Sequence, residues 1–298
     1  MTVTHATRRN FRFFHPLRVR WAEVDMQKIV FNAHYLMYFD TAIADYWRAL
    51  ALPYETTMQA LQGDLYVIKA SIEFHASAHI DDQLDVALKC SRIGTSSCVF
   101  TAAIFRGEEH LISGELIYVF ADPATQTSKP VPASFRDILL AYEAGESMAR
   151  FELGNWQTLG VDARQVRHQV FVEEQRIALE MEFDQADETA VHALARNRLG
   201  LPVATARLLQ RAPGVGQIGR LAVNRVLRGA KLGRALLQTL VQAARQRGDH
   251  EVMLQAQRSV QGFYTRLGFV PRGEPFAQAG IEHIEMVLPL RDSASAAP

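Results

Sequence analysis

The sequence predicts two unrelated domains: an α+β domain in which a sheet wraps one long helix, followed by an α/β domain. Three observations support this: one helical apolar pattern near the start, a run of β-rich segments after it, and alternating strands and helices beyond residue 150. With 298 residues the chain has room for two domains that each bury a core. No internal repeat links the halves, so we expect two different folds.

The first half opens with a strand and then a long helix. Between Phe11 and Arg20, apolar residues take odd positions and several arginines take even ones, which is the alternation of a strand. Residues 32–50 have helical spacing instead. Their apolar positions are Leu36, Phe39, Ile43, Tyr46, Trp47 and Leu50.

Four segments rich in β-forming residues follow this helix. They cover residues 65–75, 84–93, 97–105 and 111–120. Pairs such as Asp81-Asp82 and Gly94-Thr95 separate them, as turns do. We therefore expect a meander of four strands and, after Pro132, a short helix at about 134–143.

The second half has a different order of predicted strands and helices. It reads as strand, helix and three strands, then a strong helix at 229–247, a strand at 250–255, a helix at 259–267 and a strand near 282–288. We expect the first domain at 1–143, a linker at 144–150, the second domain at 151–290 and a tail at 291–298.

Composition excludes several classes of protein. The formal net charge is zero, so there is no general electrostatic case for a nucleic-acid or anionic-membrane partner. Residues 1–150 carry 14 Lys and Arg against 17 Asp and Glu, and residues 151–298 carry 18 against 15, which suits an anion site in the second half. No apolar run approaches the roughly 18 residues of a membrane span. Cys90 and Cys98 have no metal-ligand spacing, so we expect two buried reduced thiols, no metal and a cytoplasmic protein.

A carboxylate stands in an unusual place in the first half. Asp25 lies between Val24 and Met26, just ahead of an apolar run and the predicted helix start near Asn32. The N–H groups at a helix start can hold an oxyanion, and a carboxylate facing them would form a pair suited to acyl transfer. The simpler interpretation is that Asp25 caps the loop.

The first half resembles a known family of enzymes. The stretch VDMQKIVFNAHYL at 24–36, with DDQLDV at 81–86, IGTSS at 93–97 and PVP at 130–132, is similar to the 4-hydroxybenzoyl-CoA thioesterases, including their YbgC-like acyl-CoA branch. The likeness runs from about residue 12 to 142 and implies the hotdog fold.

This resemblance gives Asp25 a chemical role. In that family the corresponding Asp is the general base or nucleophile acting on an acyl-CoA thioester, and N–H groups at the helix start, here near Asn32, hold the carbonyl oxygen. The family forms dimers or tetramers with the active site at a subunit interface. Many members have Gly in place of Lys28 and several have His in place of Asn32. Two interpretations of His34 remain open: it takes the catalytic role of that His, or it is a structural residue.

A second candidate site lies in the second half. The apolar strand IGRLAV at 218–223 is followed by RGAKLG at 228–233 and then by the strong helix. Small residues let a backbone approach a phosphate closely, and the helix start supplies N–H donors. The alternative is a turn that only connects a strand to a helix.

The second half resembles the GNAT superfamily of acetyl-CoA-dependent N-acetyltransferases. The turn at 228–233, the motif FYTRLGF at 263–269, VFVEEQ at 170–175, EFD at 182–184 with Asp187, His192, and GIEHI at 280–284 are similar to its ElaA-like branch. The likeness covers about 151–290.

The GNAT resemblance assigns roles to three regions. It implies that Leu221, Ala222 and Val223 pair with the pantetheine arm of acetyl-CoA and that Tyr264 protonates the departing thiolate. The pyrophosphate would lie on the turn formed by Arg228, Gly229, Ala230, Lys231, Leu232 and Gly233. Lys231 stands where the superfamily has a glycine.

An acceptor amine would bind near acidic or basic side chains of the second half. The candidates are Glu174, Glu182, Asp184, Asp187 and His283. The simpler interpretation of the four acids is a solvated acidic loop.

These inferences predict a bifunctional enzyme with CoA thioesters and an amine as substrates, and a homo-oligomer without a nucleic-acid partner. The first domain would hydrolyse acyl-CoA and the second would transfer an acetyl group. The alternative is an acyl-CoA-binding regulatory or scaffold protein in which one or both domains are inactive, because a fold does not fix a function.

Overall fold

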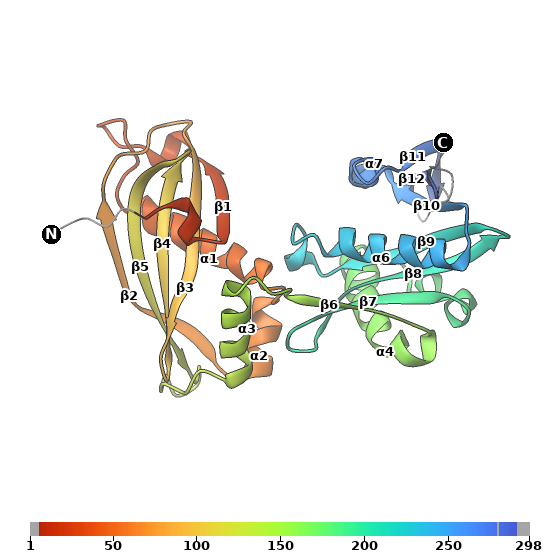
Figure 1. The fold of residues 1–298 in the computed structure, drawn as a ribbon, viewed down its shortest axis with the longest axis horizontal. Helices are drawn as coiled ribbons and strands as arrows, with labels where there is room; N and C mark the ends of the chain where they lie inside the picture. The colour runs from red at the N-terminus through yellow and green to blue at the C-terminus, as the bar shows by residue number, and fades with distance from the viewer. Residues whose placement is uncertain (1–5, 279, 291–298) are drawn as a thin grey trace, which may run out of the picture. The chain divides into compact units, whose positions relative to one another are not determined.

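The computed structural model describes residues 6–278 and 280–290, and the predicted tail at 291–298 lies outside them (Figure 1). The chain divides between Met148 and Ala149 into two compact units, called unit 1 and unit 2 below. Each unit is described by itself.

Unit 1 is built on an antiparallel sheet with the strand order β1-β3-β4-β5-β2. Its strands are β1 (Phe13–Arg18), β2 (Asp64–Phe74), β3 (Gln83–Ile93), β4 (Ser97–Arg106) and β5 (Glu109–Ala121). The four predicted strands are confirmed, but a simple meander is wrong, because β2 pairs with β5 at the sheet edge instead of with β3.

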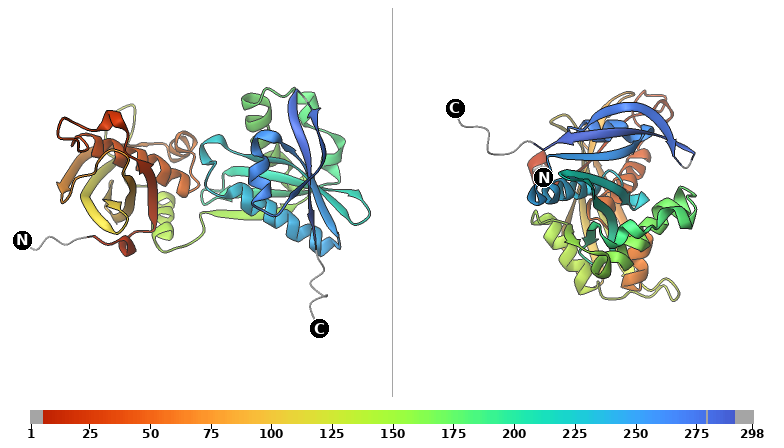
Figure 2. Two further views of the ribbon diagram at one scale, coloured as in Figure 1. Left: turned by 90° about the horizontal axis from the view of Figure 1, so that it is seen from above. Right: turned by 90° about the vertical axis from the view of Figure 1, so that its right-hand side faces the viewer.

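One long helix, α1 (His34–Ala49), lies against this sheet, as Figures 1 and 2 show. Its buried residues are Tyr35, Tyr38, Phe39, Ala42, Tyr46 and Trp47, which form one face. Phe39 fits over Gly114 of β5, where an added Cβ would come within 2.5 Å of its ring. Tyr46 packs edge-on against Phe100 of β4 at 5.6 Å. The predicted sheet wrapped on a helix is therefore confirmed.

Two shorter helices complete unit 1. The predicted helix near 134–143 is α3 (Ala133–Glu143), whereas α2 (Tyr54–Leu61) was not predicted. An eight-residue helix spans only about two turns, too few for its apolar spacing to be distinctive.

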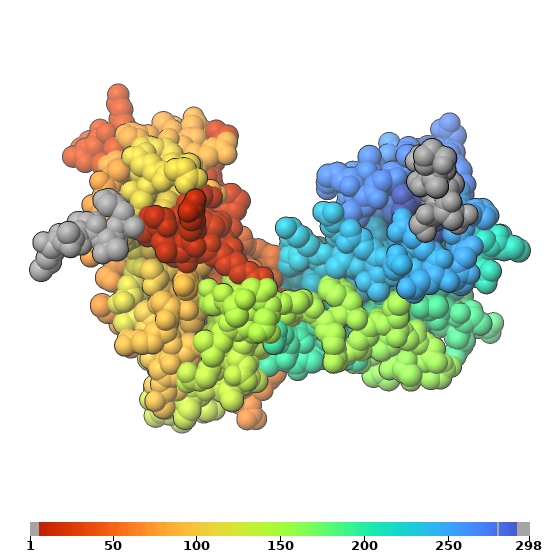
Figure 3. Space-filling model, in the orientation of Figure 1, coloured from red at the N-terminus to blue at the C-terminus, as the bar shows by residue number. Residues whose placement is uncertain are grey.

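An N-terminal segment covers part of the other sheet face. It contains the 3₁₀-helix Arg8–Asn10, and Phe11 packs with Ala87, Ala103 and Phe105. Figure 3 shows the segment in red at the surface of unit 1. Phe11 therefore lies outside β1, whereas Phe13 within the strand packs on the opposite face, against Tyr46 of α1 at 5.3 Å.

Unit 2 is built on a mixed sheet with the strand order β11-β12-β10-β9-β8-β7-β6. Its strands are β6 (Ala149–Gly154), β7 (Val191–Asn197), β8 (Pro202–Ala212), β9 (Val215–Val223), β10 (Glu251–Gln257), β11 (Val270–Gln278) and β12 (Ile281–Pro289). Among these, β9 and β10 run parallel and the other neighbouring pairs run antiparallel.

Helices cover both faces of this sheet (Figure 1). They are α4 (Trp156–Arg167), α5 (Leu179–Glu182), α6 (Leu232–Arg247) and α7 (Gln261–Thr265). Leucines of α6 pack with Ile218 of β9, whereas Val166 of α4 packs with Ala222 on the opposite face. The predicted alternation of strands and helices is confirmed, with β11 as an additional strand.

Two features outside the sites bear on the predictions. Cys90 and Cys98 are buried free thiols, and burial raises the pKa of Cys98 to about 11. Within the described residues, the helices are all too short or too polar to cross a membrane.

Candidate active sites

Asp25 lies in a tight loop between β1 and α1. β1 ends at Arg18, and the loop is closed by a bridge between Val24 and Val30. The Asp25 N–H donates to Ile29 O at 2.9 Å, and Asp25 O accepts from Lys28 N–H at 2.9 Å. Asp25 Oδ1 accepts from Gln27 N–H at 2.8 Å. The loop thus orients the carboxylate while leaving Oδ2 without a bond from the loop.

Lys28 has a left-handed backbone with φ of 64°. Glycine adopts this conformation without strain, which explains why a glycine would suit this turn. The Lys28 side chain is exposed and does not line the pocket described below. The lysine therefore preserves the loop geometry.

Glu23 anchors the loop to α1. Glu23 is 3% exposed, and its carboxylate accepts from Arg20 N–H at 2.7 Å and from the Tyr38 hydroxyl at 2.7 Å. Its carbonyl oxygen accepts from Phe31 N–H at 2.9 Å. A buried carboxylate needs such partners, and here they tie both ends of the Asp25 loop to the helix.

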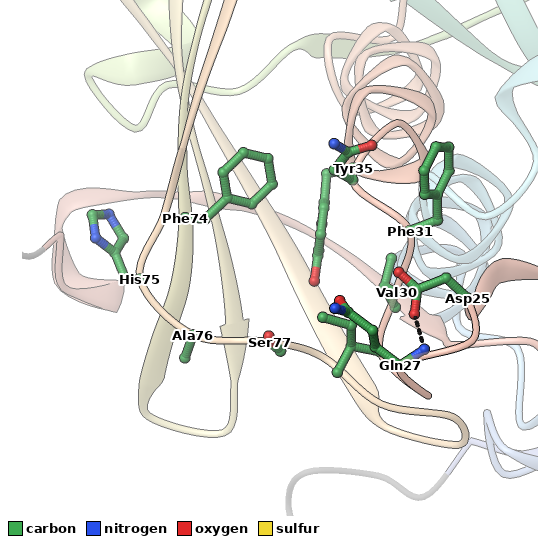
Figure 4. A pocket seen from close by; sticks show the side chains of 11 residues that line it. Asp25, Gln27, Val30, Phe31, Tyr35, Phe74, His75, Ala76 and Ser77 are labelled. Atoms are coloured by element: carbon green, nitrogen blue, oxygen red, sulfur yellow. Dashed lines mark hydrogen bonds between the residues drawn. The ribbon is translucent and has the colours of Figure 1, made fainter.

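A cavity of about 360 Å³ opens between this loop, the start of α1 and the end of β2 (Figure 4). It is lined by Asp25, Gln27, Ile29, Val30, Phe31, Asn32, Tyr35, Phe74, His75, Ala76 and Ser77. The structure thus brings Asp25 and Asn32 together. His34 does not line the cavity, and its ring packs edge-on against Phe31 at 6.0 Å.

The residues before the helix offer a hydrogen-bond donor at the cavity that Asp25 also lines. The helix begins at His34, two residues later than predicted, because His34 N–H bonds back to Phe31 O at 2.9 Å in a preceding turn. Within the described residues, the Asn32 N–H has no backbone partner. Ala33 at the N-cap supplies no side-chain cap. An exposed N–H beside the positive end of a helix suits a carbonyl oxygen that gains negative charge.

The far wall of the cavity was missed by sequence reasoning. Phe74 packs against Tyr35 at 5.8 Å, and the Tyr35 hydroxyl accepts from Ala78 N–H at 3.2 Å. Figure 4 shows His75 on the strand side, away from Asp25, and its Nε2 lies 2.9 Å from Ser113 Oγ. No local motif marks these residues, since they meet α1 across some 40 positions of sequence.

In unit 2 the parallel strands β9 and β10 separate partway along. They pair only from Val215 to Gln217 on β9, within the described residues. Beyond Gln217, β9 keeps its pairing with β8 but not with β10. Leu221, Ala222 and Val223 therefore keep one backbone edge open. Unpaired backbone groups of this kind can bind an extended ligand.

The predicted phosphate turn leads from β9 into α6. The helix begins at Leu232, not at Gly229, and its N-cap Lys231 has a left-handed backbone with φ of 65°. The lysine thus adopts a glycine-like conformation, as Lys28 does in unit 1. An added Cβ on Gly233 would meet Val223 at 3.3 Å and Phe263 at 3.8 Å, so α6, β9 and α7 converge at this turn.

Arg228 is already engaged by a carboxylate. Its Nη1 and Nη2 donate to Glu174 Oε1 and Oε2, both at 2.7 Å. Glu174 ends the π-helix His168–Glu174, which continues α4. An anion on this turn would compete with Glu174 for the guanidinium. Two predicted site residues are thus brought together as an ion pair.

Tyr264 lies on α7 among aromatic rings. Its ring packs against Phe263 at 5.0 Å and Phe269 at 6.0 Å. Burial raises the pKa of Tyr264 to about 12. The phenol therefore stays protonated at neutral pH, which a proton donor requires.

The predicted solvated acidic loop is wrong for Glu182 and Asp187, whereas the side chains of Glu174 and Asp184 are partly exposed. Glu182 is 2% exposed and Asp187 is also 2% exposed, and both belong to a buried ion network with three arginines. Arg167 Nε donates to Glu182 Oε1 at 2.6 Å and its Nη1 to Asp187 Oδ1 at 2.7 Å. Unpaired buried carboxylates would be costly, so the arginines neutralise them.

Asp184 belongs to the same network. Arg207 Nη1 donates to Asp184 Oδ1 at 2.6 Å and Nη2 to Asp184 Oδ2 at 2.8 Å, and Nη1 also reaches Asp187. Hydrogen bonds from Arg207 hold the pKa of Asp184 below its usual range. Asp184 thus already has a cationic partner in Arg207, and an acceptor amine that binds Asp184 would have to replace this arginine.

His283 and Glu174 approach the same end of β10. His283 of β12 pairs with Gln257 of β10, and Gln257 Nε2 donates to Gln175 Oε1 at 3.2 Å, next to Glu174. The His283 ring stacks on Phe276, and its Nδ1 lies 2.8 Å from Ile281 O. Asp184 has other partners, since it accepts from Arg207 of β8.

Comparisons with known proteins identify one domain in each half of the chain. A family model described as thioesterase superfamily matches residues 27–113, and one described as acetyltransferase (GNAT) domain matches residues 160–290. A putative acetyltransferase of Bacillus subtilis is 33% identical over 128 residues, which are 42% of this chain and 85% of that protein. The acyl-CoA thioester hydrolase YbgC of Escherichia coli is 27% identical over 123 residues, which are 40% of this chain and 89% of that protein.

One solved structure is similar to part of this chain. The crystal structure of Escherichia coli ElaA is 30% identical, and the match covers 47% of this chain and 99% of that chain with a TM-score of 0.43.

Proposed function

The chain joins a thioesterase-superfamily domain to a domain of the GNAT acetyltransferase family, and we propose that it is a bifunctional enzyme of CoA thioesters. Unit 1 would hydrolyse an acyl-CoA, and unit 2 would transfer the acetyl group of acetyl-CoA to an amine. The observation that carries the proposal is the cavity shared by Asp25 and Asn32.

In unit 1, the proposed chemistry is attack on a thioester carbonyl. Asp25 activates a water or attacks directly, and the N–H of Asn32 stabilises the oxyanion that forms. The loop bonds of Asp25 and the anchoring of Glu23 support a carboxylate held in a fixed orientation. Release of free thiol from a panel of acyl-CoAs tests this activity, and a chain that binds them without releasing thiol would be a regulatory protein instead.

In unit 2, the proposed acetyl-CoA site combines the open edge of Leu221 to Val223 with the turn at 228–233. The pyrophosphate would rest on the N–H groups at the start of α6 and compete with Glu174 for Arg228. The left-handed backbone of Lys231 supports this placement, since it preserves the turn that a glycine would form.

Tyr264→Phe is expected to lower the turnover of acetyl transfer by about 10²-fold or more, because the thiolate loses its proton donor. Phenylalanine keeps the packing with Phe263 and Phe269. Acetyl-CoA consumption with a panel of amines measures the effect, in an Asp25→Asn background that removes hydrolysis by unit 1. An unchanged rate would remove Tyr264 as the acid.

We also propose that the chain forms a homo-oligomer through the edge strand β2. Val67 is 49% exposed and Ile68 is 63% exposed on this edge, and an open apolar edge favours pairing with another chain. Ile68→Lys is expected to dissociate the oligomer in sedimentation experiments, because a charge on the edge opposes strand pairing. The exposed change Lys69→Arg serves as its control. A monomeric wild-type chain would contradict the proposal.

A further inference from the structure

A bulge interrupts β9 directly before the residues proposed to bind the pantetheine arm. Thr205 pairs with Ala222 and Arg207 pairs with Gly219, so one residue of β8 faces both Arg220 and Leu221. Arg220 has a φ of 53°, in the left-handed region. Glycine is the usual residue at such a bulge position, because other side chains are strained there.

The side chain of Arg220 is held by the segment 181–184. Its Nε donates to Glu182 O at 3.0 Å and lies 3.1 Å from Glu182 Oε2. Its Nη2 donates to Met181 O at 3.2 Å and to Asp184 Oδ2 at 3.3 Å. A strained backbone persists when its surroundings fix it, and these four contacts do so.

The segment 181–184 is in turn fixed by the buried network. Arg167 is 1% exposed, and besides its bond to the Glu182 carboxylate it donates to Glu182 O at 2.6 Å. Arg207 holds Asp184 through two bonds. The contacts therefore form a continuous path from the end of α4 and from β8, through Glu182 and Asp184, to the bulge of β9.

We propose that Arg220 is a positioning residue for the cofactor-binding strand. The network holds its side chain, keeps its backbone left-handed and thereby fixes the open edge of Leu221 to Val223. The inference rests on the proposed acetyl-CoA site of unit 2. The competing explanation is a network that only stabilises the fold.

Calorimetric titration of the full chain with CoA provides the test. The binding event that belongs to unit 2 is the one that Lys231→Glu removes. Arg220→Ala is expected to weaken this event about tenfold, because alanine retains the left-handed strain without the side-chain contacts. Arg220→Gly is expected to bind CoA nearly as well as wild type, because glycine adopts the conformation without strain.

The role of the network is tested in two backgrounds. Glu182→Gln is expected to weaken CoA binding severalfold when Arg220 is present, and to have no effect on affinity in the Arg220→Gly background. Asp184→Asn, at a partly exposed carboxylate, gives the same comparison if Glu182→Gln does not fold. The control is Arg196→Gln, which breaks ion pairs with Glu152 and Asp162 in the same unit and should leave affinity unchanged.

Each outcome decides between the explanations. Equal CoA affinity of wild type and Arg220→Ala overturns the inference. An equal loss from Glu182→Gln in both backgrounds assigns the network to stability alone and overturns it as well. If Lys231→Glu removes no binding event, the proposed acetyl-CoA site itself fails, and the inference fails with it.

Discussion

Replacing Asp25 with Asn is expected to lower the turnover of acyl-CoA hydrolysis by about 10²- to 10⁴-fold, because an amide neither accepts a proton nor attacks a carbonyl. The amide has the shape of the carboxylate, and its oxygen can still accept from Gln27 N–H, so the loop should persist. Release of free thiol from the best acyl-CoA of a panel measures the effect.

The control for this variant is Glu55→Gln. Glu55 is an exposed carboxylate in the first turn of α2 and does not line the cavity. The Glu55→Gln variant should therefore hydrolyse acyl-CoA at the wild-type rate. Equal rates for wild type and Asp25→Asn on every thioester would remove the thioesterase proposal, and retained binding would favour an acyl-CoA-binding protein.

The second large effect concerns stability. Arg167→Met is expected to destabilise unit 2 by about 3–5 kcal/mol, because it removes one of the two arginine partners from each of the buried carboxylates of Glu182 and Asp187. Methionine retains much of the side-chain volume, so the loss reflects charge more than packing. The denaturant dependence of amide exchange in α6 measures unit 2 separately from unit 1.

Arg272→Met provides the matched comparison. Arg272 is 47% exposed and pairs with Glu251 and Glu285 at the sheet edge, where an ion pair contributes about 0–1 kcal/mol. If Arg167→Met lowers the free energy of unfolding by a similarly small amount, the buried carboxylates do not depend on Arg167, and the prediction is wrong.

Within the network, Asp184 contributes a pH dependence of stability whose sign follows from its lowered pKa. The pKa of Asp184 is lowered in the folded chain, so its stabilisation is present above the pKa of the unfolded state and is lost as the pH falls through the folded value.

The spacing of apolar residues predicted the helices and strands that bury one face against the core. α1 and the strands β3, β4 and β5 were found because their apolar residues recur at the spacing of the structure they form. The place of β2 at the sheet edge could not be found this way, since strand order depends on contacts between distant segments. The helices α2 and α5 are too short for a distinctive pattern.

The sites were predictable where a motif is local. Asp25 and Asn32 lie seven positions apart, and one loop brings them to one cavity. The buried network instead joins residues from α4, the segment after it, β8 and β9. Four acids close in sequence therefore indicated a solvated loop, and only the folded structure shows that Glu182 and Asp187 are buried in ion pairs with arginines.

The π-helix His168–Glu174 determines the directions in which the side chains of Glu174 and Gln175 point. A π-turn accommodates an extra residue within a helix, and each residue of an α-helix turns the chain by about 100°. Loss of one residue here would let α4 continue regularly and would swing Glu174 off Arg228 and Gln175 off Gln257. Related chains that differ by a single insertion in this segment would therefore present different side chains at the same two strands.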